Sequence, residues 1–232
     1  MRPDRRAVIF DLDDTLYPLR RFVLSGFAAA ARHLERARGL DGRAVFAELS
    51  RAMRTHRGHE LQVLAHRRRL PPSIVPDLVT VIRGHQPRLR LPRQTAYALG
   101  ALRRGWQLGI VTNGFPDIQA RKVRALGLDL AVDTVVYASE HGSGAGKPDR
   151  EPFLEALARL DVAPDRAVFV GDDERCDLFG AGRIGMFTVY LGGWRRRPVL
   201  PRACCADAMV ASLADVPDVA KQLVDERWKH VA

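Results

Sequence analysis

Residues 7–15 read AVIFDLDDT, a short apolar run that passes directly into a group of carboxylates. The apolar residues 7–10 predict a strand that is buried on both faces. Because side chains two apart leave a strand on the same side, Asp11 and Asp13 at the strand end can converge on one point. Crowding two like charges costs free energy unless a cation or a shared proton offsets it. The alternative interpretation is a polar turn in which an aspartate caps the next helix.

Four further apolar runs follow along the chain, and each ends in a polar or glycine-containing turn. They cover residues 107–111, 134–137, 167–170 and 186–191. Helical patterns cover residues 118–126, 152–160 and 178–183 between the later runs, and residues 216–231 near the end. Strands that alternate with helices of about ten residues are typical of βαβ units and a parallel sheet. We therefore predict an α/β fold with a parallel sheet covered by helices on both faces.

The alternation is interrupted between Leu16 and about Pro92, where the sequence has no strand pattern. This stretch has helical patterns at residues 20–38, 42–56, 61–68 and 73–84, separated by glycines and prolines. A segment of this length is too long for a loop. We therefore expect an α/β core of residues 1–15 and 93–232 and an all-helical cap of residues 16–92. The cap is expected over the carboxyl ends of the strands, where ligands bind in open α/β folds.

The composition is that of a globular protein with an unusual basic balance. The 232 residues are 47% hydrophobic and 28% charged, and the net charge is +10. No apolar run approaches the roughly 18 residues of a membrane span, and the first residues lack a signal-peptide pattern. Only four of the 37 basic residues are lysines, which indicates a compositional bias rather than a surface for nucleic acid. A small phosphorylated or acidic substrate explains the basic balance equally well. We expect a cytoplasmic monomer or homodimer with no nucleic-acid or membrane partner.

Two later turns carry groups that suit an anion. The second apolar run ends in Thr112-Asn113-Gly114, where a hydroxyl and backbone N–H groups freed by glycine can form a small anion cradle. Lys147 stands between a glycine and a proline in a chain that otherwise favours arginine. A lysine offers a compact point charge to a phosphoryl oxygen. The alternative is a solvated surface lysine.

The fourth apolar run ends in Gly171-Asp172-Asp173, and Asp177 follows in the first turn of the next predicted helix. Asp177 can cap that helix or point back at the strand end. Together with Asp11 these carboxylates suit a hard cation that binds oxygen, and Mg²⁺ is the obvious candidate. Either Asp172 or Asp173 could be the ligand, although the strand-end position favours Asp172.

The motifs taken in order resemble those of the haloacid dehalogenase-like (HAD) hydrolase superfamily. They are Asp11-x-Asp13-x-Thr15, Thr112, Lys147 and Gly171-Asp172-(x)4-Asp177, and the resemblance covers residues 6–193. The helical insert is similar to the family's C1 cap. The stretch Asp11–Pro18, with Phe22 and Gly26-Phe27, is similar to the subgroup of small phosphatases that includes pyrimidine 5'-nucleotidases and sugar-phosphate phosphatases. The resemblance implies a doubly wound, Rossmann-like parallel sheet with the strand order 5-4-1-2-3.

The resemblance also implies roles for the motif residues. Asp11 would be the nucleophile that becomes an aspartyl phosphate, and Asp13 the general acid and base. Thr112 and the backbone of Asn113 would hold phosphoryl oxygens, and Lys147 would balance their charge. The implied Mg²⁺ ligands are Asp11, the backbone carbonyl of Asp13, Asp172 and, through water, Asp177, which could instead orient Lys147. The expected activity is Mg²⁺-dependent hydrolysis of a small phosphomonoester, a nucleotide or a sugar phosphate.

Three other activities compete with this one. Dehalogenation is disfavoured because Asp13 supplies a proton that a halide leaving group does not need. A phosphomutase, which returns the phosphoryl group to its substrate, has the same motifs and stays open. A non-catalytic phospho-acceptor such as a receiver domain also combines carboxylates, Thr, Lys and Mg²⁺. That module places its acceptor aspartate on a later strand and has no use for a long helical insert.

Overall fold

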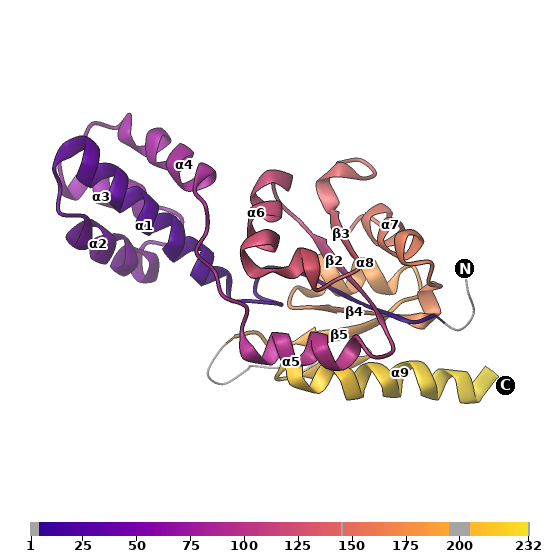
Figure 1. Ribbon diagram of the computed structural model, residues 1–232. Helices are drawn as coiled ribbons and strands as arrows, with labels where there is room; N and C mark the ends of the chain where they lie inside the picture. Colours follow the sequence, from indigo (N-terminus) through magenta and orange to yellow (C-terminus); the bar gives the residue numbers. More distant parts are fainter. Residues whose placement is uncertain (1–4, 145, 195–204, 232) are drawn as a thin grey trace. The chain divides into compact units, whose positions relative to one another are not determined.

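The computed structural model describes residues 5–144, 146–194 and 205–231, and the chain divides into two units. One unit combines Met1–Leu19 with Arg90–Ala232, and the other is Arg20–Leu89. The first unit contains a twisted sheet and the helices around it, and the second contains helices (Figure 1). None of the helices in the described part of the chain is long and apolar enough to cross a membrane.

The sheet of the first unit is wholly parallel. Its strands are β1 (Ala7–Phe10), β2 (Gln107–Thr112), β3 (Thr134–Tyr137), β4 (Ala167–Gly171), β5 (Phe187–Leu191) and β6 (Ala208–Val210). They lie in the order β3-β2-β1-β4-β5-β6, which confirms the predicted order of the first five strands and the doubly wound α/β fold. The edge strand β6 was not predicted, because its three residues are too few to form a recognisable apolar run.

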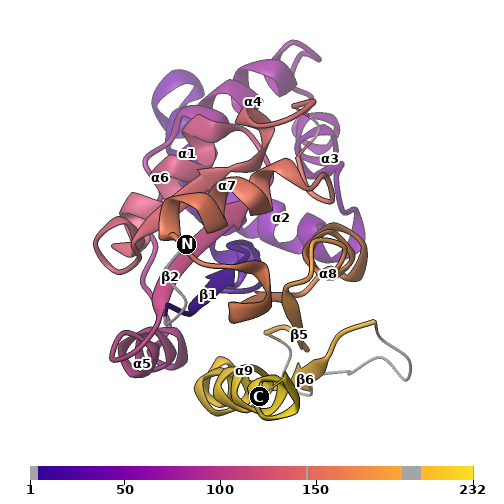
Figure 2. The ribbon, with the colours of Figure 1, turned by 90° about the vertical axis from the view of Figure 1, so that its right-hand side faces the viewer.

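Helices cover both faces of this sheet, as its apolar strands require. Helices α5 (Arg93–Leu102) and α9 (Val216–Val231) lie on one face, and α6 (Pro116–Leu126) and α7 (Glu151–Leu160) on the other (Figures 1 and 2). Ile9 packs with Phe153 of α7 in one apolar cluster, and Phe10 points to the opposite face. All four residues of β1 are fully buried.

The first unit differs from the expected core at its boundaries. Leu16 and Tyr17 belong to it although the expected boundary placed them in the helical insert, and both are fully buried. The hydroxyl of Thr95, in the unpredicted helix α5, donates to the carbonyl oxygen of Leu16 at 2.7 Å. This bond connects α5 to the turn after β1 within the first unit.

The predicted start of the helix at residues 178–183 was wrong, because helical structure begins earlier, at Glu174. A π-helical turn, Glu174–Leu178, comes first, and the short α8 (Phe179–Gly182) continues it. Asp177 therefore lies in the π-helical turn. The N-cap is Asp173, whose Oδ1 accepts hydrogen bonds from the backbone N–H groups of Arg175 and Cys176. Short 3₁₀ turns occur at Leu128–Leu130, Ala138–Glu140, Pro164–Arg166 and Leu213–Asp215.

The second unit is built from α1 (Leu19–Arg38), α2 (Gly42–Thr55), α3 (Glu60–Arg67) and α4 (Ile74–Gly84), each within one residue of its predicted ends. Each helix contributes a fully buried leucine to one shared core: Leu34, Leu49, Leu64 and Leu78. Asp41 caps α2 by accepting from the backbone N–H of Arg43 at 2.8 Å. The unit therefore has an apolar core of its own.

Candidate active site

Polar side chains follow β1, β2 and β4 at the points where these strands end. Phe10 of β1 pairs with Ile110 of β2 and Val170 of β4, so the three strands end at the same edge of the sheet. The backbone N–H of Asp11 continues this pairing by donating to the carbonyl oxygen of Val170 at 2.9 Å. Asp11, Thr112 and Asp172 therefore leave the sheet at one edge, where ligands bind in open α/β folds.

Lys147 links two carboxylates at this edge. Its Nζ lies 2.6 Å from Oδ1 of Asp11 and 2.6 Å from Oδ1 of Asp177, and it donates to the carbonyl oxygen of Val111 at 3.0 Å. The Lys147 side chain is 2% exposed, which contradicts the alternative of a solvated surface lysine. A buried charge is tolerated only when it is paired and hydrogen-bonded, and Lys147 meets both conditions.

The loop that carries Lys147 is fixed by Asn113. Asn113 Nδ2 donates to the carbonyl oxygen of Lys147 at 3.0 Å, and Asn113 Oδ1 accepts from the Lys147 N–H at 2.8 Å. Gly146 has a φ of +81°, and a Cβ there would lie 2.6 Å from Asn113 Oδ1. Both the backbone conformation and the close approach require glycine. The Asn113 side chain thus positions Lys147, a role in addition to the one predicted for the Asn113 backbone.

A group of three carboxylates could hold a metal ion. Oxygen atoms of Asp11, Asp172 and Asp177 all lie within 4.8 Å of one another. Gly171 allows this approach, because a Cβ there would collide with the Asp177 carboxylate. The Asp13 carboxylate is not part of this group, and the predicted ligand at that residue is its backbone carbonyl. Asp173 is also outside the group, because its carboxylate caps the π-helical turn.

The electrostatics of the group favour an added cation. Burial raises the pKa of Asp11 to about 8, with the neighbouring Asp177 adding to the shift and Lys147 opposing it. Burial, together with Asp177, raises the pKa of Asp172 to about 7. Burial would lower the pKa of Lys147, but the two carboxylates at its Nζ outweigh that effect and raise it. Three crowded carboxylates, of which only Asp11 and Asp177 pair with Lys147, therefore fit a hard divalent ion with oxygen ligands.

Asp13 is held by residues that were not predicted to belong to the site. Tyr17 Oη donates to Oδ1 of Asp13 at 2.6 Å, while Gln119 Nε2 and Lys122 Nζ lie 3.0 Å and 2.6 Å from Oδ2. Gln119 Nε2 also donates to the hydroxyl of Thr112 at 2.5 Å. The signal available in the sequence was the spacing of Gln119 and Lys122, three residues apart on one predicted helix face.

The other residues of the first turn have local roles. Asp14 has a φ of +58°, and its carboxylate accepts from the backbone N–H of Leu19 at 2.9 Å. The hydroxyl of Thr15 lies 3.4 Å from Oδ1 of Asp172. Asp14 therefore shapes the turn, and Thr15 connects it to the carboxylate that follows β4.

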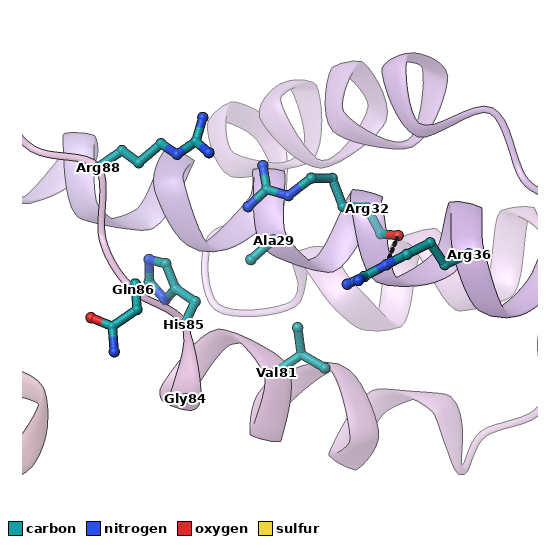
Figure 3. A pocket seen from close by; sticks show the side chains of 8 residues that line it. All are labelled: Ala29, Arg32, Arg36, Val81, Gly84, His85, Gln86 and Arg88. Atoms are coloured by element: carbon teal, nitrogen blue, oxygen red, sulfur yellow. Dashed lines mark hydrogen bonds between the residues drawn. The ribbon is translucent and has the colours of Figure 1, made fainter.

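A basic hollow of about 440 Å³ lies within the second unit. Arg32 and Arg36 of α1 and Arg88 after α4 line it together with the buried His85 (Figure 3). Ser25 anchors this segment, because its hydroxyl accepts from the backbone N–H of Arg88 at 2.9 Å. The hollow shares no lining residue with the carboxylate group after β1.

A comparison of the whole sequence with known protein families agrees with the order and geometry of these residues. The sequence profile of the haloacid dehalogenase-like hydrolases matches residues 5–185. The chain belongs to this family. The predicted resemblance is therefore confirmed, and the protein is an HAD-like hydrolase of the phosphatase class.

Relatives of this HAD-like hydrolase include several phosphatases of small metabolites. It is 30% identical over 207 residues to the glyceraldehyde 3-phosphate phosphatase of Methanopyrus kandleri, covering 85% of this chain and 88% of that one. It is 34% identical over 204 residues to the ribulose-1,5-bisphosphate 5-phosphatase of Halopiger xanaduensis, covering 79% and 83%. An HAD-superfamily hydrolase of subfamily IA from Geobacter sulfurreducens shares the fold, with a TM-score of 0.65, 22% identity and coverage of 94% and 97%.

Proposed function

We propose that the protein is a Mg²⁺-dependent phosphomonoesterase that hydrolyses a small phosphorylated metabolite through an aspartyl phosphate on Asp11. The observation that carries the proposal is the buried arrangement of Asp11, Lys147 and Asp177, with 2.6 Å between Lys147 Nζ and each carboxylate. Lys147 occupies Oδ1 of Asp11, which leaves Oδ2 as the attacking atom. A carboxylate held in this way can act as a nucleophile toward phosphorus.

The carboxylates of Asp11, Asp172 and Asp177 fit Mg²⁺, because all of their donor atoms are oxygens and their charges are crowded. We propose that they hold the ion together with the backbone carbonyl of Asp13, with Asp177 acting through water. When bound, Mg²⁺ would offset the negative charge that opposes the approach of a carboxylate to a phosphate.

The proposed reaction has two half-reactions. In the first, Oδ2 of Asp11 attacks phosphorus, and the bond to the leaving oxygen breaks as Asp13 gives that oxygen its proton. In the second, Asp13 takes a proton from water, the water oxygen attacks phosphorus, and the bond to Asp11 breaks to release inorganic phosphate. The Thr112 hydroxyl, the Asn113 backbone and Lys147 would bind the phosphoryl oxygens throughout.

We further propose that the unit Arg20–Leu89 acts as a cap whose side chains select the leaving group. The relatives act on glyceraldehyde 3-phosphate and ribulose-1,5-bisphosphate, so short sugar phosphates are the first candidate substrates and nucleotides the second. The wild-type protein should be tested for release of inorganic phosphate from a panel of both classes, with Mg²⁺ and with EDTA. Release that depends on Mg²⁺ is expected.

The same experiment separates hydrolysis from phosphoryl transfer back to the substrate. With a substrate labelled in its phosphoryl group, hydrolysis moves the label into inorganic phosphate. A label that stays on the sugar but changes position would replace the hydrolase proposal with a phosphomutase. Release that is equal with Mg²⁺ and EDTA would contradict the proposed metal site.

A further inference from the structure

Lys122 is buried, as Lys147 is, and its ammonium group faces the carboxylate of Asp13 in the first motif. The Nζ atom lies 2.6 Å from Oδ2 of Asp13, and the two side chains are 5% and 23% exposed. The rest of the buried face of α6 includes Val123 and Leu126, which are ordinary apolar core residues. Burying an ammonium group on this face costs free energy that a leucine would not cost. The lysine therefore requires a reason beyond packing.

The surroundings of Lys122 indicate what that reason is. Its partner Asp13 receives donors on both carboxylate oxygens, from Tyr17 on Oδ1 and from Gln119 and Lys122 on Oδ2. These contacts hold the Asp13 side chain in one orientation. Gln119 is shared with Thr112, so α6 positions the carboxylate and the hydroxyl together. Lys147, in contrast, bonds to Asp11 and Asp177.

We propose that Lys122 is a positioning residue for the reaction, which aims the Asp13 carboxyl group at the leaving-group oxygen. The inference rests on the proposed function, in which Asp13 protonates that oxygen. Small errors in the placement of a catalytic group cost large factors in rate. Without Lys122, Asp13 would remain present but would lose its strongest fixed contact at Oδ2.

The test compares two substrates that differ in their need for a proton. The leaving group of p-nitrophenyl phosphate is a stable anion and departs without protonation, whereas the alcohol of a sugar phosphate needs the proton of Asp13. Lys122→Met keeps an unbranched side chain as far as the ε carbon and removes the ammonium group with its charge and donors. We expect kcat/KM for the best sugar phosphate of the panel to fall by about 10- to 100-fold. We expect a much smaller fall for p-nitrophenyl phosphate.

Three controls make the result specific. Lys221→Met removes an exposed lysine of α9 and should leave both substrates unchanged. Lys122→Arg, which keeps a cation, should recover part of the sugar-phosphate rate. In an Asp13→Asn background, Lys122→Met should cause little further loss, because two residues that act through one group are not additive. If Lys122→Met does not fold, Lys122→Gln takes its place in each comparison.

An equal fall in kcat/KM for the two substrates would overturn the inference and leave Lys122 with a structural role. The inference would also be overturned if the losses of activity caused by Lys122→Met and Asp13→Asn were fully additive. Neither result contradicts the proposed function. That proposal would be contradicted by a wild-type protein that releases no phosphate, or by an Asp11→Asn variant that still releases it.

Discussion

Asn113 binds both backbone polar groups of Lys147, with Nδ2 at 3.0 Å from the carbonyl oxygen and Oδ1 at 2.8 Å from the backbone nitrogen. Asn113 is the only asparagine in the chain, and the lysine that it positions pairs with Asp11. This contact joins the end of β2 to the Lys147 loop, two segments that are 34 residues apart in the sequence.

Replacing Asn113 should therefore affect stability and turnover together. Asn113→Ala removes two hydrogen bonds and should lower the free energy of unfolding by about 1–3 kcal/mol. It should also lower kcat, because Lys147 is no longer held beside Asp11. Urea denaturation and steady-state kinetics measure the two effects. Asn113→Asp keeps the size but places a carboxylate oxygen against the Lys147 carbonyl, so it should be no better than alanine.

Gly146→Ala should weaken the contact between Asn113 and the Lys147 backbone, because the change lies in the loop that carries Lys147. The new Cβ would lie 2.6 Å from Asn113 Oδ1 at a residue whose φ is +81°. A loss of about 1–3 kcal/mol in the free energy of unfolding is expected from the strained backbone. Gly100→Ala is the matched control, because nothing lies within 4 Å of its Cβ position in α5, and it should be neutral or stabilising. Equal effects of the two variants would contradict the close approach.

Asp11→Asn should abolish turnover in a protein that stays folded. The amide keeps the shape of the side chain but cannot act as the nucleophile, so kcat should fall by roughly 10³-fold or more. Asp177 remains as a partner for Lys147, which limits the structural damage. Phosphate release and circular dichroism are the measurements. A variant that retains activity would rule out Asp11 as the nucleophile.

Asp172→Ala should change the Mg²⁺ requirement, whereas Asp173→Ala should change the stability, although the two residues are adjacent. Asp172 lies in the carboxylate group, so its loss should raise the Mg²⁺ concentration for half-maximal activity by about 10-fold or more. Without metal, Asp172→Ala should unfold no more easily than the wild type, because it relieves crowding of like charges. Asp173→Ala loses a helix cap and about 1 kcal/mol of stability while keeping most of its turnover. Mg²⁺ titrations and thermal unfolding distinguish the two residues, and a reversed pattern would exchange their roles.

The outline of the fold could be predicted from local sequence patterns. The apolar run before Asp11 and its four successors each became a strand of the sheet, because a strand buried on both faces needs an uninterrupted apolar stretch. The exceptions were short or weakly patterned. The strand β6 has three residues, and α5 lies in the stretch before β2, for which no element is predicted.

The carboxyl ends of parallel strands share one edge, so the gathering of Asp11, Thr112 and Asp172 follows from the order of the elements. The same reasoning could not identify the partners of Asp13. Whether Gln119 and Lys122 face a carboxylate or solvent depends on how α6 packs against the sheet, and the spacing of residues alone does not define that rotation.

The sequence by itself determined the family, the parallel α/β architecture and the motif residues at the strand ends, because these depend on short-range pattern and on strand direction. Only the tertiary structure decided how the buried charges pair: Lys147 with Asp11 and Asp177, and Lys122 with Asp13. The physical reason is that a buried charge takes its partner from whichever segment folding brings within hydrogen-bond distance. In this protein those segments are up to 136 residues away along the chain.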